Sequence, residues 1–95
     1  MKKFHNIFLG KKILIYGLGK SGITSYKFLK NKAELYLFDD NLKKKINSKI
    51  NQRLHNLKQV SKFKFDKIII SPGIDISNCK LSKFLNKIIQ KFILI

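Results

Sequence analysis

The chain has 95 residues, of which 44% are hydrophobic, and its 21 Lys and Arg residues against five Asp and Glu residues give a formal net charge of +16. This length allows one small domain with one core, and the hydrophobic content is enough to bury that core, so the chain need not be disordered. No apolar run reaches the roughly 18 residues of a membrane span, and Lys11 and Lys12 interrupt the first apolar stretch too early for a signal peptide. We therefore expect no membrane partner.

The positive charge has two interpretations. Nucleic-acid-binding domains are strongly basic, but those that read bases rely on arginine, and Arg53 is the only arginine here. The lysines are scattered and only residues 43–45 form a run, while Ile and Asn are also abundant. This pattern favours a compositional drift with a solvated surface, and a nucleic-acid partner is the less favoured alternative.

The cysteine and histidine content argues against a disulfide or a metal site. Cys79 is the only cysteine, and neither His5 nor His55 has a partner at metal-ligand or catalytic-triad spacing. We interpret both histidines as surface residues and expect a reducing, cytoplasmic compartment.

The first part of the chain alternates strand and helix. Residues 12–17 form a short apolar run that ends in glycine, which is typical of a buried parallel strand. Residues 20–31 follow with apolar side chains at helical spacing, and residues 34–38 predict a second strand that ends at a polar turn.

The second part continues the alternation. Residues 42–62 allow either a short helix, because Ile46, Ile50 and Leu54 are spaced i, i+4, or a short strand near Leu54. Residues 67–70 predict a buried strand, which a proline stops.

The last part predicts an amphipathic helix followed by a strand at residues 92–95. The helix, with Ser77 or Asn78 as its cap, has an apolar stripe made of Leu81, Phe84, Leu85, Ile88, Ile89 and Phe92. The whole alternation predicts a single α/β domain over residues 1–95, with an open parallel sheet and helices on both faces.

A glycine-rich motif joins the first strand to the first helix. Gly17, Gly19 and Gly22 form a G-x-G-x-x-G in which the first glycine permits a tight turn, the second lets a phosphate approach the backbone, and the third lets the helix pack close to the sheet. The helix N-terminus offers unpaired N–H groups to an anion. A P-loop is excluded, because Leu14 stands where its first glycine would be.

Candidate ligand-lining residues follow two of the predicted strands at their carboxyl ends, the edge where ligands bind in open α/β sheets. Asp39 and Asp40 follow the second strand, and a ribose or base would donate to such an acid; the alternative is a turn aspartate that caps the next segment. Ser71, Pro72 and Gly73 follow the 67–70 strand, where they form either a ligand-lining turn or a plain strand-ending turn.

Three segments together resemble the opening of the Mur ligases over residues 10–95. They are residues 10–22, the pair Asp39 and Asp40, and residues 66–74 with Ser-Pro-Gly-Ile after a strand. The similarity is greatest to the branch that adds D-glutamate to UDP-N-acetylmuramoyl-L-alanine in peptidoglycan synthesis and cell wall biogenesis. The resemblance implies an N-terminal, UDP-binding domain built on a Rossmann-like sheet of about five strands.

The resemblance also implies the site residues. Gly17, Gly19, Lys20, Ser21 and Gly22 would lie at the UDP diphosphate, Asp39 and Asp40 near the uracil and ribose, and Ser71, Pro72 and Gly73 along the other wall. Where relatives carry arginine, this chain has Asn41, and Lys43 or Lys44 would replace that phosphate contact. No residue of this chain is expected to be catalytic or to bind a metal.

The family's ATP-binding central domain and its C-terminal domain are expected to be absent, so this chain would be a fragment that is inactive as a ligase. By resemblance, the parent ligase would use ATP and Mg²⁺. A dehydrogenase or regulatory domain that binds NAD or NADP is the main alternative, since its glycine motif and Asp39 would look the same.

Overall fold

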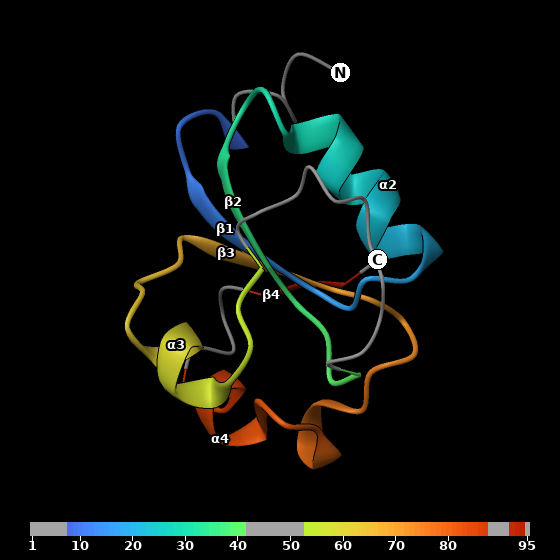
Figure 1. Ribbon diagram of the computed structural model, residues 1–95, viewed down its shortest axis with the longest axis vertical. Helices are drawn as coiled ribbons and strands as arrows, with labels where there is room; N and C mark the ends of the chain where they lie inside the picture. The colour runs from blue at the N-terminus through green and yellow to red at the C-terminus, as the bar shows by residue number, and fades with distance from the viewer. Residues whose placement is uncertain (1–7, 42–52, 88–91, 95) are drawn as a thin grey trace.

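The computed structural model describes residues 8–41, 53–87 and 92–94. Four parallel strands form one sheet in the order β2-β1-β3-β4 (Figure 1). Their bounds are Lys12–Tyr16 for β1, Glu34–Phe38 for β2, Lys67–Ile70 for β3 and Phe92–Leu94 for β4. The predicted parallel α/β architecture is confirmed.

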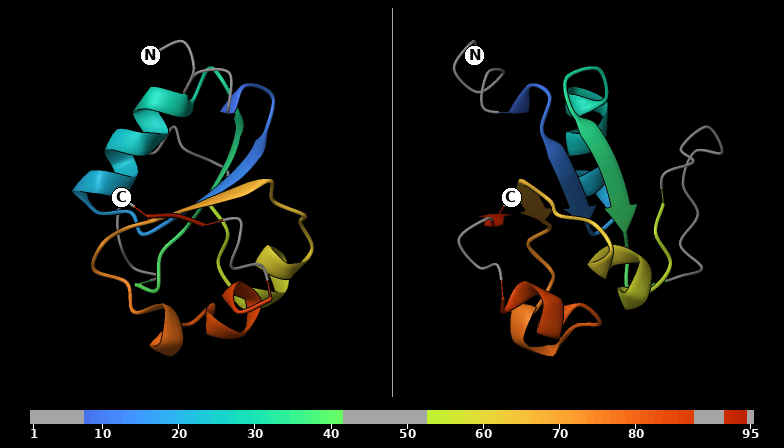
Figure 2. Two further views of the ribbon diagram at one scale, coloured as in Figure 1. Left: turned by 180° about the vertical axis from the view of Figure 1, so that it is seen from behind. Right: turned by 90° about the vertical axis from the view of Figure 1, so that its left-hand side faces the viewer.

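Helices cover both faces of the sheet (Figure 2). Strand side chains alternate between faces, so Ile13 and Ile15 pack under α2 (Lys20–Leu29), while Leu14 and Tyr16 point to the opposite face. That opposite face carries three short helices: α3 (Leu57–Ser61), the 3₁₀ helix η1 (Ile76–Asn78) and α4 (Ser82–Leu85). The apolar runs of β1 and β3 are therefore buried from both sides.

The predicted elements differ from the structure mainly at their ends. The first strand stops at Tyr16 because Gly17 adopts φ +103°, and α2 ends at Leu29 rather than at residue 31. The amphipathic helix is shorter than predicted, because α4 ends at Leu85. The predicted strand at residues 92–95 is confirmed as β4 over Phe92–Leu94, so Phe92 belongs to the strand and not to the helical stripe. Residues 88–91 lie outside the described ranges.

The predicted cap of this last helix is wrong. Leu81 occupies the N-cap position of α4 without a side-chain hydrogen bond, so neither Ser77 nor Asn78 caps it. The capping side chain in this region is Asp75, whose Oδ1 accepts a hydrogen bond of 3.0 Å from the Ser77 N–H at the start of η1.

The expected count of about five strands is not met within the described residues, which contain four. Beyond β2, the chain makes one parallel bridge between Leu37 and Arg53, where the Leu54 N–H donates to the Leu37 carbonyl at 2.7 Å. One bridge is not a strand, although it lies where a short strand near Leu54 was one of the two interpretations. Ile46 and Ile50 of the alternative helix lie outside the described residues.

Candidate functional site

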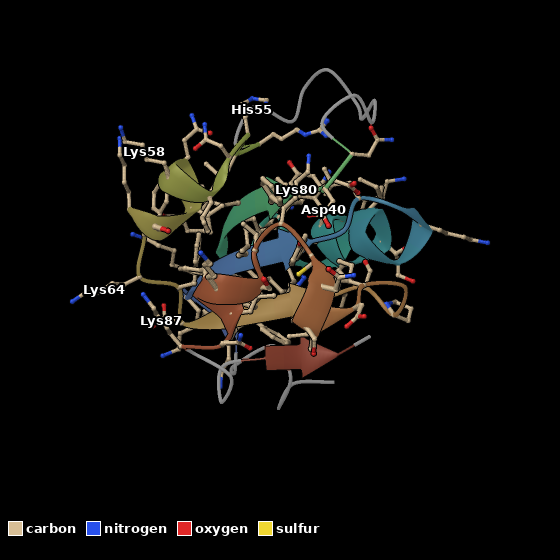
Figure 3. All side chains as sticks on the ribbon, turned by 90° about the horizontal axis from the view of Figure 1, so that it is seen from below. Asp40, His55, Lys58, Lys64, Lys80 and Lys87 are labelled. Carbon is tan, nitrogen blue, oxygen red and sulfur yellow. The ribbon has the colours of Figure 1, made fainter. Side chains whose placement is uncertain are left out.

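The two predicted ligand-lining turns meet at one edge of the sheet. β1 and β3 are neighbours; after β1 the chain turns to α2 on one face, and after β3 it turns to η1 and α4 on the other. In open α/β sheets, ligands bind at this kind of switch point, outside the carboxyl ends of the strands. β1 and β2 run downwards in the right-hand view of Figure 2, and in Figure 3, seen from below, the strand arrows point to the right, towards this edge.

Direct hydrogen bonds join the two turns. The Ser71 N–H donates to the Tyr16 carbonyl at 3.0 Å, and the Ser71 hydroxyl donates to the Gly17 carbonyl at 3.3 Å. Ser71 therefore positions one turn against the other. Pro72 and Gly73 lie on the exposed side of their turn.

The glycines of this edge fall into two classes. A Cβ on Gly17 would lie 2.5 Å from Ser71 Oγ, and a Cβ on Gly22 would lie 1.7 Å from the Gly17 carbonyl oxygen. These two glycines are needed for packing, which confirms the predicted close approach of α2 to the sheet. A Cβ on Gly19 or Gly73 would meet no atom within 4 Å, and neither residue has a positive φ.

Packing therefore does not require glycine at position 19 or 73, and at both positions the missing side chain leaves the backbone accessible. Gly19 has extended backbone, φ −76° and ψ −162°, at the N-cap of α2. No side chain caps this helix, no acidic residue lies in its first turn, and Lys20 and Ser21 are exposed. The first N–H groups of a helix have no intrahelical acceptor, so this end of α2 is open to an anion.

Asp39 holds the glycine-rich turn in place. Its Oδ2 accepts a hydrogen bond of 2.7 Å from the Leu18 N–H, and its Oδ1 accepts one of 2.8 Å from the Asn41 N–H. The bond from Asn41 makes Asp39 a turn-capping residue, which was the alternative interpretation to a contact with the ligand. Each carboxylate oxygen has a further lone pair, so the expected contact of Asp39 with a ribose or base stays a prediction.

Asp40 also has partners within the protein. The hydroxyl of Tyr16, which is fully buried at the end of β1, donates to Asp40 Oδ1, and the Lys80 N–H donates to Asp40 Oδ2 at 3.4 Å. Burial, together with the hydrogen bond to Asp40 and the proximity of Cys79, raises the pKa of Tyr16 well above its ordinary value. Tyr16 therefore remains a hydrogen-bond donor at neutral pH.

Sequence reasoning missed Tyr16 and Lys80. The available signal for Tyr16 was a hydroxyl at the last position of an otherwise apolar strand, because a buried tyrosine hydroxyl needs a partner. Nothing in the sequence indicated Lys80, since 40 residues separate it from Asp40.

The expected replacement for the missing arginine is not tested, because Lys43 and Lys44 lie outside the described residues. Instead, the structure places the chain's one arginine beside Asn41. Arg53 Nη2 donates to the Asn41 carbonyl at 3.0 Å. A guanidinium group therefore does lie near position 41, although it comes from a different part of the chain.

A separate groove of about 380 Å³ lies between α3 and α4. Its lining residues are Leu57, Ser61, Lys83, Phe84 and Lys87, and none of the predicted site residues is among them. In the described part of the chain, no helix is long and apolar enough to cross a membrane.

Comparison with known proteins gives a family. The family model described as Mur ligase MurD-like, N-terminal domain, matches residues 11–91. The chain belongs to this Mur ligase family. The match includes every residue predicted to line the site, and the inferred resemblance to the Mur ligases is confirmed.

Curated relatives of this Mur ligase domain carry the name UDP-N-acetylmuramoylalanine–D-glutamate ligase. The chain is 39% identical to one from Rickettsia prowazekii (strain Madrid E) over 79 residues, covering 77% of this chain and 17% of the relative. It is 43% identical to one from Buchnera aphidicola subsp. Schizaphis graminum (strain Sg) over 72 residues, covering 70% of this chain and 16% of the relative. The chain thus spans about a sixth of these relatives. No solved structure matches it significantly.

Proposed function

We propose that this Mur ligase domain binds the UDP moiety of UDP-N-acetylmuramoyl-L-alanine, as the N-terminal part of an ATP-dependent ligase that adds D-glutamate in cytoplasmic peptidoglycan synthesis. The names of the relatives support the substrate. The observation that carries the location is the open backbone at Gly19 and Gly73, on two turns that meet at the β1/β3 switch point.

The diphosphate would lie at the N-terminus of α2. Gly19 has no side chain to obstruct the phosphates, and the N–H groups that follow it point out of an uncapped helix. Lys20 and Ser21 are exposed in this first turn, where an ammonium and a hydroxyl add donors for phosphate oxygens. The chemistry of this end therefore fits an anionic group.

The uridine would extend towards the carboxyl end of β2. Asp39 directly follows the last residue of β2. Its carboxylate accepts hydrogen bonds from two backbone N–H groups and has further lone pairs that can accept from a ligand. Pro72 and Gly73 would form the opposite wall, with Ser71 fixing that wall to the glycine-rich turn. Gly17 and Gly22 act in this arrangement by allowing the turn and the close packing of α2.

The ATP-dependent steps are proposed for the remainder of the ligase. There, ATP with Mg²⁺ would activate the substrate carboxylate as an acyl-phosphate, which the amine of D-glutamate attacks. The proposed phosphate-binding turn at residues 17–22 is assigned to UDP, and the sequence lacks the G-x-x-x-x-G-K-[ST] pattern of a P-loop. The proposed partners of the domain are therefore the substrate and the central and C-terminal domains of the ligase.

The test is a titration of the ¹⁵N-labelled chain with UDP, NAD and random single-stranded DNA. We expect UDP to shift the amide signals of residues 17–22, Ser71 and Gly73, and NAD to bind more weakly. Affinity should be low, because other domains of the ligase would help to enclose the ligand. Shifts confined to another surface, or tighter binding of NAD, would contradict the proposal.

The titration with DNA tests the alternative that the basic chain binds nucleic acid. A nucleic-acid-binding domain would bind DNA of any sequence with a steep dependence on salt concentration and would show no nucleotide preference. We expect only weak binding to DNA that disappears at moderate salt.

A further inference from the structure

A bridge of hydrogen bonds at the carboxyl edge ties together three parts of the chain. Asp40, just after β2, accepts from the Tyr16 hydroxyl at the end of β1 and from the Lys80 N–H in the turn between η1 and α4. Both of its carboxylate oxygens thus have donors within the protein. Figure 3 shows Asp40 and Lys80 side by side at this edge, next to α2.

The Tyr16 end of the bridge is fixed by packing. Its ring is fully buried and packs edge-on against Phe38, with the ring centroids 5.6 Å apart. Burial and the hydrogen bond to Asp40 raise its pKa, so the phenol keeps its proton and continues to donate. The position of the Asp40 carboxylate is therefore set by the core.

The Lys80 end is held by a compact turn. Cys79, next to Lys80, is half-buried, and its Sγ lies 3.7 Å from the Ile76 carbonyl oxygen in η1. Cys79 also lies close enough to Tyr16 to contribute to the raised pKa of the phenol. The turn is thus packed over the end of β1, with Lys80 beside Asp40.

The charge of Lys80 is not neutralised within the described ranges. Its side chain is exposed, and the ion pair found there joins Lys12 to Glu34, at the other end of the strands. Asp40 faces neutral donors, a hydroxyl and a backbone N–H, rather than the Lys80 ammonium. Asp39, the neighbour of Asp40, holds the Leu18 N–H, so both the glycine-rich turn and the Lys80 turn are tied to the same end of β2.

We propose that Lys80 supplies a side-chain cation to the phosphates of the bound nucleotide, and that Asp40 is a positioning residue that acts through Lys80 rather than on the uridine. This inference rests on the proposed function. A lysine on a flexible stem suits a phosphate as a point charge, and the anchored turn limits the volume that its ammonium samples.

The experiment compares UDP with uridine on the full chain and on matched variants. Lys80→Gln should weaken UDP binding about fivefold or more and leave uridine binding unchanged, because only UDP carries phosphates. Lys83→Gln is the control: it changes the net charge equally, but Lys83 lies on α4 and lines the groove between α3 and α4, which contains none of the predicted site residues. It should bind UDP like the parent chain.

Asp40→Asn separates positioning from direct contact. The amide oxygen can still accept from Tyr16, but the amide nitrogen cannot accept from the Lys80 N–H. We expect weaker UDP binding, unchanged uridine binding, and no further loss when Asp40→Asn is added to Lys80→Gln. A purely structural role would lower the affinity for both ligands together.

The outcomes are distinguishable. If the parent chain fails to bind UDP, the proposed function fails and this inference fails with it. If the parent binds UDP and Lys80→Gln binds it equally well, the proposed function stands and the role of Lys80 is wrong. If Asp40→Asn weakens uridine binding as well as UDP binding, the positioning role through Lys80 is wrong, because Asp40 then either contacts the nucleoside or supports the site as a whole.

Discussion

Replacing Gly22 with alanine tests the packing that brings α2 onto the sheet. The added Cβ would lie 1.7 Å from the Gly17 carbonyl oxygen, whereas a relaxed C···O contact is about 3.3 Å or longer. The obstructing atom is backbone, so helix and turn must separate by about 1.6 Å. Overpacking of this kind costs about 3 kcal/mol or more, and the better helix propensity of alanine offsets about 1 kcal/mol.

We therefore expect Gly22→Ala to lower the free energy of unfolding by about 2 kcal/mol or more. For a domain of this size, that corresponds to a fall in Tm of about 8–16 °C. Gly19→Ala is the matched control, because its Cβ would meet no atom within 4 Å at an ordinary negative φ. The free energy of unfolding of Gly19→Ala should stay within about 1 kcal/mol of that of the parent chain. Alanine is a less favourable N-cap than glycine, but it also lowers the conformational entropy of the unfolded chain, and the two effects offset each other.

The assay is thermal unfolding followed by circular dichroism at 222 nm on the three chains. A Tm of Gly22→Ala within about 3 °C of the control would refute the reasoning, because α2 would then not depend on the contact between Gly22 and the Gly17 carbonyl.

Four other predictions follow from the same edge. Gly19→Val should abolish UDP binding in the NMR titration while the spectrum stays folded; unchanged affinity would place the phosphates elsewhere. Asp39→Ala should lower the free energy of unfolding in urea by about 1–3 kcal/mol, because it leaves the Leu18 N–H, in a buried residue, without its acceptor; an unchanged urea midpoint would contradict this. The pKa of the Tyr16 phenol is raised above 10.0 in the folded chain, so the phenol loses its proton at a lower pH in the unfolded chain than in the folded chain. The free energy of unfolding should therefore fall as the pH rises above about 10. In Tyr16→Phe, the urea midpoint should decrease less between pH 9 and 11 than it does in the parent chain. An equal decrease in both chains would contradict a raised pKa of the Tyr16 phenol. Given ATP, Mg²⁺, UDP-N-acetylmuramoyl-L-alanine and D-glutamate, the 95-residue chain should release no more phosphate than a no-protein control; release that Gly19→Val abolishes would reveal a catalytic site in this chain.

Most of the sheet and the glycine-rich turn could be predicted because their signals are local. The strands at residues 34–38 and 67–70 were predicted with their observed bounds, since each is a short apolar run that ends at a turn residue. The last helix was harder. Its apolar stripe continued into Phe92, but pairing of Phe92 with Ile68 in the sheet overrides the helical pattern there.

The spacing of the glycine motif predicted a separate role for each glycine, and the structure shows that packing requires Gly17 and Gly22 and leaves Gly19 open. The obstacle at Gly22 is the Gly17 carbonyl, which belongs to the same motif. The obstacle at Gly17 is the Ser71 side chain, and this contact could not be predicted from the motif because Ser71 comes from a distant turn.

The sequence by itself determined the alternation of strand and helix, the turn at Gly17 and the family, because these depend on residues close together along the chain or on matched motifs. Only the tertiary structure decided the strand order β2-β1-β3-β4 and the bridge from Tyr16 through Asp40 to Lys80. The bridge joins residues 24 and 40 positions apart, and no local propensity encodes such a contact. Packing of β1, β2 and the turn between η1 and α4 brings these residues together, although only Tyr16 is itself buried. The hydrogen-bonding demand of its buried hydroxyl then selects the partner.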